Sequence, residues 1–300
     1  MTAIILLDGG MGQELIRRAG DAPHPLWATK VMLDHPGLVQ QVHADYFGAG
    51  ATIATANTYA IHHDRLAKHG LDESFAALHA AALAEAEAAR AAHGSGRIAG
   101  SLGPLVASYR PETLPPHDTA VALYAEVAGI LAPRCDLLIG ETVASVAHAS
   151  ALIAGARPVA ARAGIPLWLA VTVDDTDGTR LRSGEPVAEL KGHLDGVAAL
   201  LANCSAPEAM DQAMPHLKAH GLPFGAYANG FQQITAAFLK EDSTVDALST
   251  RPEMTPERYA GFALGWVAQG ATIVGGCCET SPAHIAEIAR RLRAAGHAIA

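Results

Sequence analysis

The sequence is poor in aromatic residues, in charge and in cysteine. Aromatic residues make up 5% and charged residues 17% of its 300 residues, whereas 50% are hydrophobic. Such a chain can bury a large core, and that core must be built mainly from Ala, Val, Leu and Ile. Four cysteines are too few for a disulfide framework in a chain of this length, and they suit thiols or metal ligands in a reducing compartment.

Basic runs and long apolar segments are also lacking. The 21 basic residues are outnumbered by 30 acidic ones, and the net charge of -9 argues against a nucleic-acid partner. No apolar run approaches the roughly 18 residues of a membrane span. Residues 1–8 lack the basic and long apolar regions of a signal peptide. We therefore expect a cytoplasmic protein that binds neither nucleic acid nor a membrane.

Short apolar runs alternate with longer Ala-rich segments of helical period along the chain. This order predicts repeated βα units around a parallel sheet. The candidate strands are residues 4–7, 51–55, 97–100, 136–140, 167–173, 196–202, 224–227 and 271–275. Eight parallel strands with intervening helices close into a barrel. We predict an α/β fold, a (β/α)8 TIM-type barrel, with residues 1–300 as a single domain.

Capping signals and breaker residues agree with this pattern. Thr255-Pro256 and Ser281-Pro282 each place a hydroxyl residue before a proline, which is typical of a helix start. Residues 74–92 are nearly all Ala, Leu and Glu, and we predict a helix there. Gly and Pro cluster in three further stretches, residues 20–36, 108–117 and 228–255. We predict loops there, at the C-terminal face of the barrel, where barrel enzymes carry their active sites.

Three of the four cysteines follow candidate strands: Cys204 follows the sixth, and Cys277 and Cys278 follow the eighth. Loops after these two strands can meet over the barrel axis, and Gly275-Gly276 breaks the strand so that both adjacent cysteines can face inward. Zinc prefers four tetrahedral ligands, and a site with three protein ligands leaves one position for water or substrate. A thiol bound there ionises and stays nucleophilic. The three cysteines therefore predict a catalytic Zn²⁺ site, with a vicinal disulfide or a redox role as alternatives.

Other potential ligands are less informative. Cys135 precedes the fourth strand, at the opposite end of the barrel, and we interpret it as a buried apolar residue. His62 and His63 are adjacent, so their side chains diverge, and we expect both to be solvated.

Two acidic residues and a glycine pair also follow candidate strands. Asp8-Gly9-Gly10 ends the first strand, and Glu141 places a carboxylate at the barrel mouth after the fourth. Asp8 taken alone could be a plain turn former. The glycine-rich turns match no nucleotide-binding motif, but exposed amides in them could receive a small carboxylate.

Together these strand-end residues resemble the homocysteine S-methyltransferase family. The resemblance covers nearly the whole chain, and its most specific part is Asn-Cys followed much later by Gly-Gly-Cys-Cys. It rests on the segments LDGGM at 7–11, TANTY at 55–59, GSLGP at 100–104, GET at 140–142, NC at 203–204 and GGCCET at 275–280.

The resemblance implies a zinc-dependent barrel enzyme in which the three cysteines bind the metal and homocysteine sulfur completes the tetrahedron. It also implies that Asp8, Gly9, Gly10 and Glu141 hold the amino-acid end of homocysteine. A carboxylate such as Glu141 suits the ammonium group, and amides near Gly9 and Gly10 suit the carboxylate.

The reaction that the resemblance implies is methyl transfer from a sulfonium, S-methylmethionine or S-adenosylmethionine, to homocysteine, giving methionine. An in-line displacement by a thiolate needs no general base. Relatives that use cobalamin or folate carry additional domains, for which 300 residues leave no space. Thr142 stands where betaine-using relatives have tyrosine, and residues 227–231 lack a proline that many relatives have before the asparagine. Alternatives are a betaine-like donor, a different thiol or selenol acceptor, and a zinc or redox thiol protein without turnover.

Overall fold

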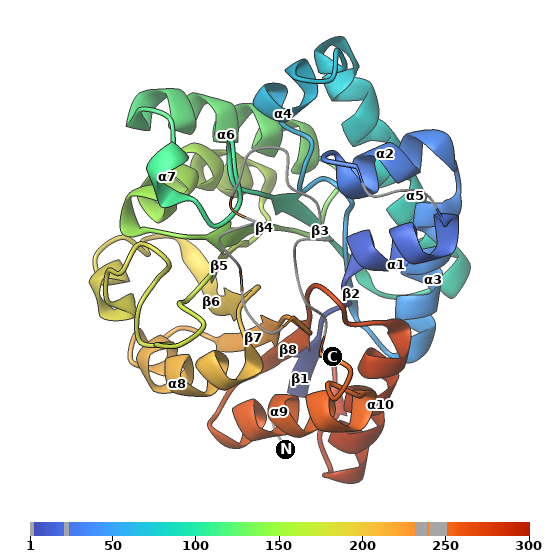
Figure 1. Cartoon of the computed structure of the whole chain (residues 1–300), viewed down its shortest axis with the longest axis vertical. Helices are drawn as coiled ribbons and strands as arrows, with labels where there is room; N and C mark the ends of the chain where they lie inside the picture. Colours follow the sequence, from blue (N-terminus) through green and yellow to red (C-terminus); the bar gives the residue numbers. More distant parts are fainter. Residues whose placement is uncertain (1–2, 21–23, 232–233, 235–238, 240–250) are drawn as a thin grey trace.

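The strands of the protein form one parallel sheet that closes on itself. The computed structural model describes residues 3–20, 24–231, 234, 239 and 251–300. Within these residues nine strands pair in the order β2-β3-β4-β5-β6-β7-β8-β1-β9. Leu7 forms a parallel bridge with Ile53, so the chain after β1 meets β2 and completes the ring. Helices surround this ring (Figure 1), and the predicted TIM-type barrel is confirmed.

All eight predicted strands are present, with small shifts at their ends. The strands are β1 Ala3–Leu6, β2 Ile53–Thr55, β3 Arg97–Leu102, β4 Leu137–Val143, β5 Leu167–Val171, β6 Val197–Asn203, β7 Phe224–Ala228, β8 Ile273–Gly276 and β9 Ala298–Ile299. The last of these was not predicted. It pairs with the outer edge of β1, where Ala3 lies opposite Ala298.

Helices lie between most consecutive strands. They are α1 Met11–Ala19, α2 Trp27–Asp34, α3 Leu38–Ala49, α4 His63–Ala67, α5 Phe75–His93, α6 His117–Leu131, α7 Val146–Ala163, α8 Pro207–Lys218, α9 Pro256–Ala268 and α10 Pro282–Ala294. Two predicted caps are confirmed, because the Thr255 side chain accepts the amide of Arg258 and Ser281 forms a capping box with His284. The helix predicted over 74–92 is α5.

One predicted loop differs from expectation, and another lies mostly outside the described residues. Residues 20–36 contain α2, so the prediction of a continuous loop there is wrong, and residues 21–23 lie outside the described part of the chain. Most of the predicted loop 228–255 also lies outside it. Between β5 and β6 the chain forms the short 3-10 helix η3 Val187–Leu190 in place of an α-helix, so the fifth βα unit consists mostly of loop.

Alternation along the strands separates two cores. In β4, Leu137 and Ile139 face the barrel interior, whereas Leu138 packs with the helices outside. The interior cluster also contains Trp168 and Tyr227, both buried. Each fully buried apolar side chain stabilises the fold by about 1.5–3 kcal/mol relative to exposure. The next inward position on β4 after Ile139 is residue 141, which directs a side chain along the barrel axis toward the C-terminal end.

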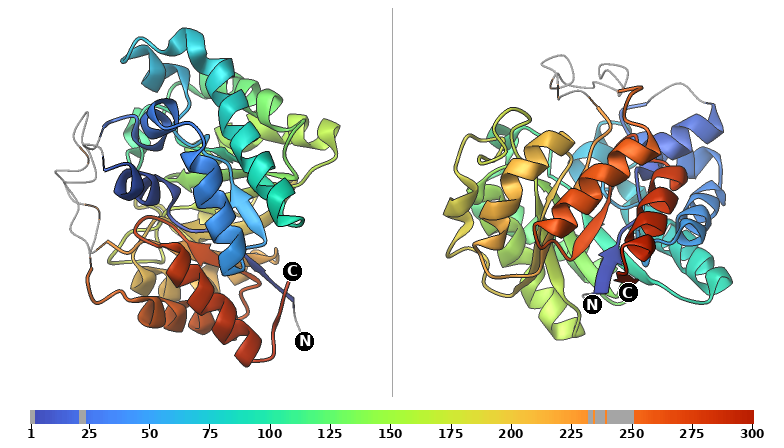
Figure 2. Two further views of the ribbon diagram at one scale, coloured as in Figure 1. Left: turned by 90° about the vertical axis from the view of Figure 1, so that its right-hand side faces the viewer. Right: turned by 90° about the horizontal axis from the view of Figure 1, so that it is seen from below.

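Strand β1 and the C-terminal strand β9 lie side by side at the N-terminal end of the barrel (Figure 2). Ala300 donates its amide to the carbonyl of Ile4 at 2.9 Å, next to the β1–β9 pair. The strand ends that carry the predicted site are therefore at the opposite end. Within the described residues no helix combines the length and the apolar character that crossing a membrane requires.

The predictions for Cys135 and for the His62-His63 pair have different outcomes. Cys135 is buried as predicted. His62, predicted to be solvated, is buried, because its ring packs edge-on against Tyr124, and burial lowers its pKa well below the usual range. His63 stays partly exposed and stacks on Phe75.

Candidate active site

The three cysteines singled out by the sequence lie together at the C-terminal end of the barrel. Cys204 directly follows β6, and Cys277 and Cys278 directly follow β8. The Sγ atoms of all three lie within 4.8 Å of one another. Cys204 and Cys277 are joined as a disulfide with their Cα atoms 5.8 Å apart, and Cys278 is a buried free thiol.

Cys204 has an unusual backbone conformation. Its φ of 50° lies in the left-handed region, which costs a non-glycine residue roughly 1–2 kcal/mol. Hydrogen bonds on both sides hold it there: its amide donates to Tyr227 O at 3.2 Å, and its carbonyl accepts from Thr172 Oγ1 at 3.3 Å. The turn at Cys204 begins directly after β6 ends at Asn203.

The loop that carries Cys277 and Cys278 packs closely against the glycines after β1. A Cβ atom on Gly10 would lie 2.5 Å from Cys277 O, so only glycine fits there without moving the loop. The Gly10 amide donates to Thr280 O at 2.8 Å. This amide is therefore already engaged with Thr280, and Gly9 and Gly10 both line the pocket that the three cysteines also line.

The donor set fits a zinc ion once the disulfide is reduced. In a tetrahedral site with Zn–S bonds of about 2.3 Å, the sulfurs lie about 3.8 Å apart, which the observed clustering within 4.8 Å approaches. A disulfide and a three-thiolate metal site exclude each other, because the disulfide sulfurs are not thiolates. Burial raises the pKa of the Cys278 thiol to about 12, so this thiol is protonated at neutral pH until a cation displaces its proton.

Two buried carboxylates lie in the same pocket. Asp8 accepts the Thr55 amide at 2.7 Å and the Thr55 hydroxyl at 2.8 Å. Glu141 accepts the Tyr227 hydroxyl at 2.8 Å and the Ser101 hydroxyl. Asp8 is therefore held by β2, whereas Glu141 is held by the adjacent strand β3 and by β7 across the barrel interior.

In the part of the chain that the structure describes, no cation compensates these carboxylates. Among the described residues, neither Asp8 nor Glu141 forms an ion pair with Lys or Arg. Burial raises the pKa of Asp8 to about 7, and the nearby Glu141 contributes. Burial also raises the pKa of Glu141, although the hydroxyls of Ser101 and Tyr227 oppose the shift. Buried charge of one sign without a partner is costly, so the pocket suits a cationic ligand group.

Aromatic rings complete the pocket. The lining includes the three cysteines, the two carboxylates and the side chains of Trp27, Tyr59, Tyr109 and Tyr227. Aromatic faces attract cations, and they exclude water from what lies between them. The arrangement can therefore hold a small molecule that has a thiol at one end and an ammonium group at the other.

Sequence reasoning did not assign Thr55, Ser101 or Tyr227 to the site. The missed signal is the alternation of inward positions. Ala99 of β3 faces the barrel interior, so Ser101 does too, as does Tyr227 of β7. The register between strands brings these inward positions beside residue 141. Register describes which residues of two strands lie opposite each other, so the pattern within one strand does not determine it.

A barrel with a cluster of cysteine sulfurs and two buried carboxylates at its C-terminal end is the architecture of a small-molecule enzyme. The profile of the family described as Homocysteine S-methyltransferase matches residues 5–292. A homocysteine S-methyltransferase from Escherichia coli is 33% identical, over 96% of this chain and 95% of its own length. The chain therefore belongs to the homocysteine S-methyltransferase family and is a methyltransferase.

Solved structures agree with this assignment. The metallated form of the homocysteine methyltransferase MmuM from Escherichia coli has a TM-score of 0.78 and 30% identity, over 96% of each chain. The oxidised form of MmuM has a TM-score of 0.79 and 29% identity, again over 96% of each chain. Similar chains of this fold have thus been obtained both with metal and oxidised.

Proposed function

We propose that the protein transfers a methyl group from a sulfonium donor, S-methylmethionine or S-adenosylmethionine, to the thiol of homocysteine, and that Zn²⁺ is required. The observation that carries the proposal is the shared pocket of three cysteine sulfurs and two buried carboxylates, which no Lys or Arg of the described residues pairs with. Its two ends match the thiol and the ammonium group of homocysteine. A metallated form of a similar chain supports a bound metal, and the three cysteines are the candidate ligands in this chain.

Cys204, Cys277 and Cys278 would hold the metal in the reduced protein. When bound, zinc lowers the pKa of a coordinated thiol and so makes the substrate sulfur a thiolate at neutral pH. Cys278 contributes a ligand that is buried and protonated in the free protein, so metal binding must release its proton. The glycines beside this loop leave no room for a larger side chain.

Glu141 and Asp8 would bind the ammonium group of homocysteine. Each carboxylate has oxygen lone pairs that do not accept from its hydroxyl and amide partners and can accept from the ammonium group. The amide of Gly9 is the candidate for the substrate carboxylate, because the Gly10 amide donates to Thr280. With its amino-acid end fixed, the substrate presents its sulfur toward the cysteines. This orientation supplies much of the barrier lowering in a two-substrate reaction.

In the reaction the substrate sulfur forms a bond to the methyl carbon as the bond from that carbon to the donor sulfur breaks. The electron pair of the broken bond stays on the donor sulfur, which leaves as a neutral thioether, and the thiol proton passes to solvent. The sulfonium charge suits a pocket with two carboxylates and aromatic walls. We further propose that the enzyme acts in the cytoplasm, where reductants keep the cysteines as thiols.

The test is methionine formation by the reduced protein from homocysteine with each sulfonium in turn, before and after metal removal with a chelator. We expect activity with one sulfonium, loss on metal removal and recovery on adding Zn²⁺. Activity that survives complete metal removal contradicts the proposed mechanism. Betaine in place of the sulfonium, and selenohomocysteine or cysteine in place of homocysteine, test the alternative donor and acceptors.

The disulfide between Cys204 and Cys277 favours one alternative, a zinc or redox thiol protein without turnover. That protein would bind metal when reduced but would show the same zinc-edge sulfur coordination with and without homocysteine. The proposed enzyme would gain one sulfur ligand when homocysteine is added.

A further inference from the structure

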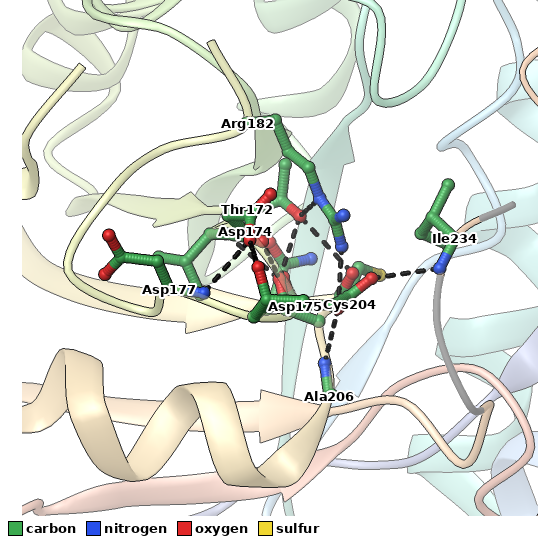
Figure 3. A network of polar contacts seen from close by, with 12 residues as sticks. Thr172, Asp174, Asp175, Asp177, Arg182, Cys204, Ala206 and Ile234 are labelled. Atoms are coloured by element: carbon green, nitrogen blue, oxygen red, sulfur yellow. Dashed lines mark hydrogen bonds and ion pairs between the residues drawn. The ribbon is translucent and has the colours of Figure 1, made fainter. Parts of the chain in front are cut away.

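Near Cys204, a buried carboxylate joins three segments of the chain. Asp175 lies in the long β5–β6 connection, and its side chain is 7% exposed. Its Oδ1 accepts the amide of Ala206 at 2.8 Å, and its Oδ2 accepts the amide of Ile234 at 2.9 Å. Figure 3 shows this carboxylate beside Cys204, between Ala206 and Ile234.

A buried arginine neutralises this carboxylate. Arg182 Nη2 lies 2.8 Å from Asp175 Oδ1, and the arginine side chain is 11% exposed. The guanidinium group lies over the ring of Tyr109, 5.5 Å from its centroid, and Tyr109 lines the pocket. Arg182 Nε also contacts Thr172 Oγ1 at 3.4 Å, and that hydroxyl donates to the carbonyl of Cys204.

The contacts converge on the one candidate metal ligand whose backbone is strained. Cys204 is left-handed, with a φ of 50°. Thr172 bonds its carbonyl, and Asp175 bonds the amide two residues further on, at Ala206, which caps α8. A strained conformation persists only where its surroundings over-determine it. Removal of the Asp175 carboxylate takes away one of these restraints and leaves the turn at Cys204 free to relax.

We propose that Asp175 is a positioning residue of the site, which acts through its hydrogen bond to Ala206 to hold Cys204 in the geometry that binds metal. The proposal rests on the proposed function in that the cysteines must bind metal. It accounts for a buried ion pair whose two residues are not among those that line the pocket. Partners that orient ligands in this way typically contribute 10–100-fold to metal affinity or activity.

The test uses Co²⁺ alone as the probe, titrated into the fully reduced full-length protein and followed by its thiolate charge-transfer absorption. We expect Asp175→Asn to weaken Co²⁺ binding roughly 10–100-fold and to alter the d–d spectrum. Asp177→Asn is the matched control from the same loop. The Asp177 side chain is 46% exposed and bonds only Thr179 and Arg180 among the described residues, so its variant should bind Co²⁺ as the wild type does.

Asp175→Asn also leaves the buried Arg182 charge unpaired, which alone can destabilise the fold. The double variant Asp175→Asn/Arg182→Gln removes that charge while the bond to Ala206 stays weakened, and it should still bind Co²⁺ poorly. Wild-type affinity and spectrum in Asp175→Asn, or restored affinity in the double variant, overturn the positioning role. If the wild-type protein gives no thiolate–cobalt band, the metal site itself fails, and both proposals fall.

Discussion

The hydroxyl of Tyr227 donates to Glu141 Oε1 at 2.8 Å inside the barrel, so a side chain of β7 holds the carboxylate that β4 presents to the pocket. This contact joins strands that are not neighbours in the sheet order, since β5 and β6 lie between them. The hydrogen bond therefore crosses the interior of the barrel. The orientation of the Glu141 carboxylate depends on the ring of strands being closed.

Tyr227→Phe should shift the pH dependence of the reaction. The hydroxyl bond lowers the pKa of Glu141 against the effect of burial, so its loss raises that pKa and the anionic form disappears at a higher pH. A hydrogen bond to a charged group contributes about 1.5–3 kcal/mol, so the acid limb of kcat/KM for homocysteine should move up by roughly one pH unit or more. The control is Tyr124→Phe, whose hydroxyl bonds His148 instead. An unmoved limb would show that Glu141 does not govern binding.

Asp8→Asn should change how stability depends on pH. Burial raises the pKa of Asp8 from 3.8 to about 7, so between these values the folded state binds more protons than the unfolded state. Stability must then fall as pH rises through this window, by on the order of 4 kcal/mol for this group. Asparagine has no proton to lose, so the variant lacks this fall. Urea unfolding of the reduced, metal-free proteins from pH 4 to pH 8 measures the difference, and parallel curves contradict it.

Metal binding should release protons. Burial raises the pKa of the Cys278 thiol to about 12, so binding of Zn²⁺ at pH 7 should expel at least this proton, and homocysteine should expel another. Calorimetry in buffers of different ionisation enthalpy counts both. Cys135→Ser is a suitable control, because burial also raises the pKa of Cys135 to about 12, although it lies at the other end of the barrel. Proton release unchanged in Cys278→Ser would remove this residue from the ligand set.

Gly10→Ala should damage the metal site by a steric route. Its Cβ would lie 2.5 Å from the carbonyl oxygen of Cys277, and backbone atoms cannot rotate away. We expect a loss of Co²⁺ affinity of at least tenfold, comparable to that of a displaced ligand partner. Gly129→Ala, with no atom within 4 Å of the new Cβ, should instead keep the affinity and raise stability by about 0.5–1 kcal/mol. Equal Co²⁺ affinity in both variants would mean that the Cys277 loop is free to move.

The strands and the cysteine cluster could be predicted because each depends on local pattern. Parallel strands buried on both faces are short apolar runs, and these are conspicuous between Ala-rich helices. Cys204 and Cys277 could be expected to meet because strand ends of a closed barrel share one rim. The meeting of these cysteines follows from the barrel geometry alone.

What could not be predicted depends on register and on tertiary packing. The bond from Tyr227 to Glu141 requires knowing which residues of distant strands share a layer. The burial of His62 depends on Tyr124, far along the chain. Helix α2 was missed because its eight residues lie among prolines and glycines and are stabilised by packing more than by propensity.

The left-handed turn at Cys204 has a consequence for how such a site can evolve. Asp and Asn tolerate this backbone conformation better than most other residues, and an aspartate there would exchange a soft sulfur ligand for a hard oxygen. One codon thus decides whether this position of the pocket offers sulfur or oxygen, while the turn is preserved and Cys277 and Cys278 still offer sulfur.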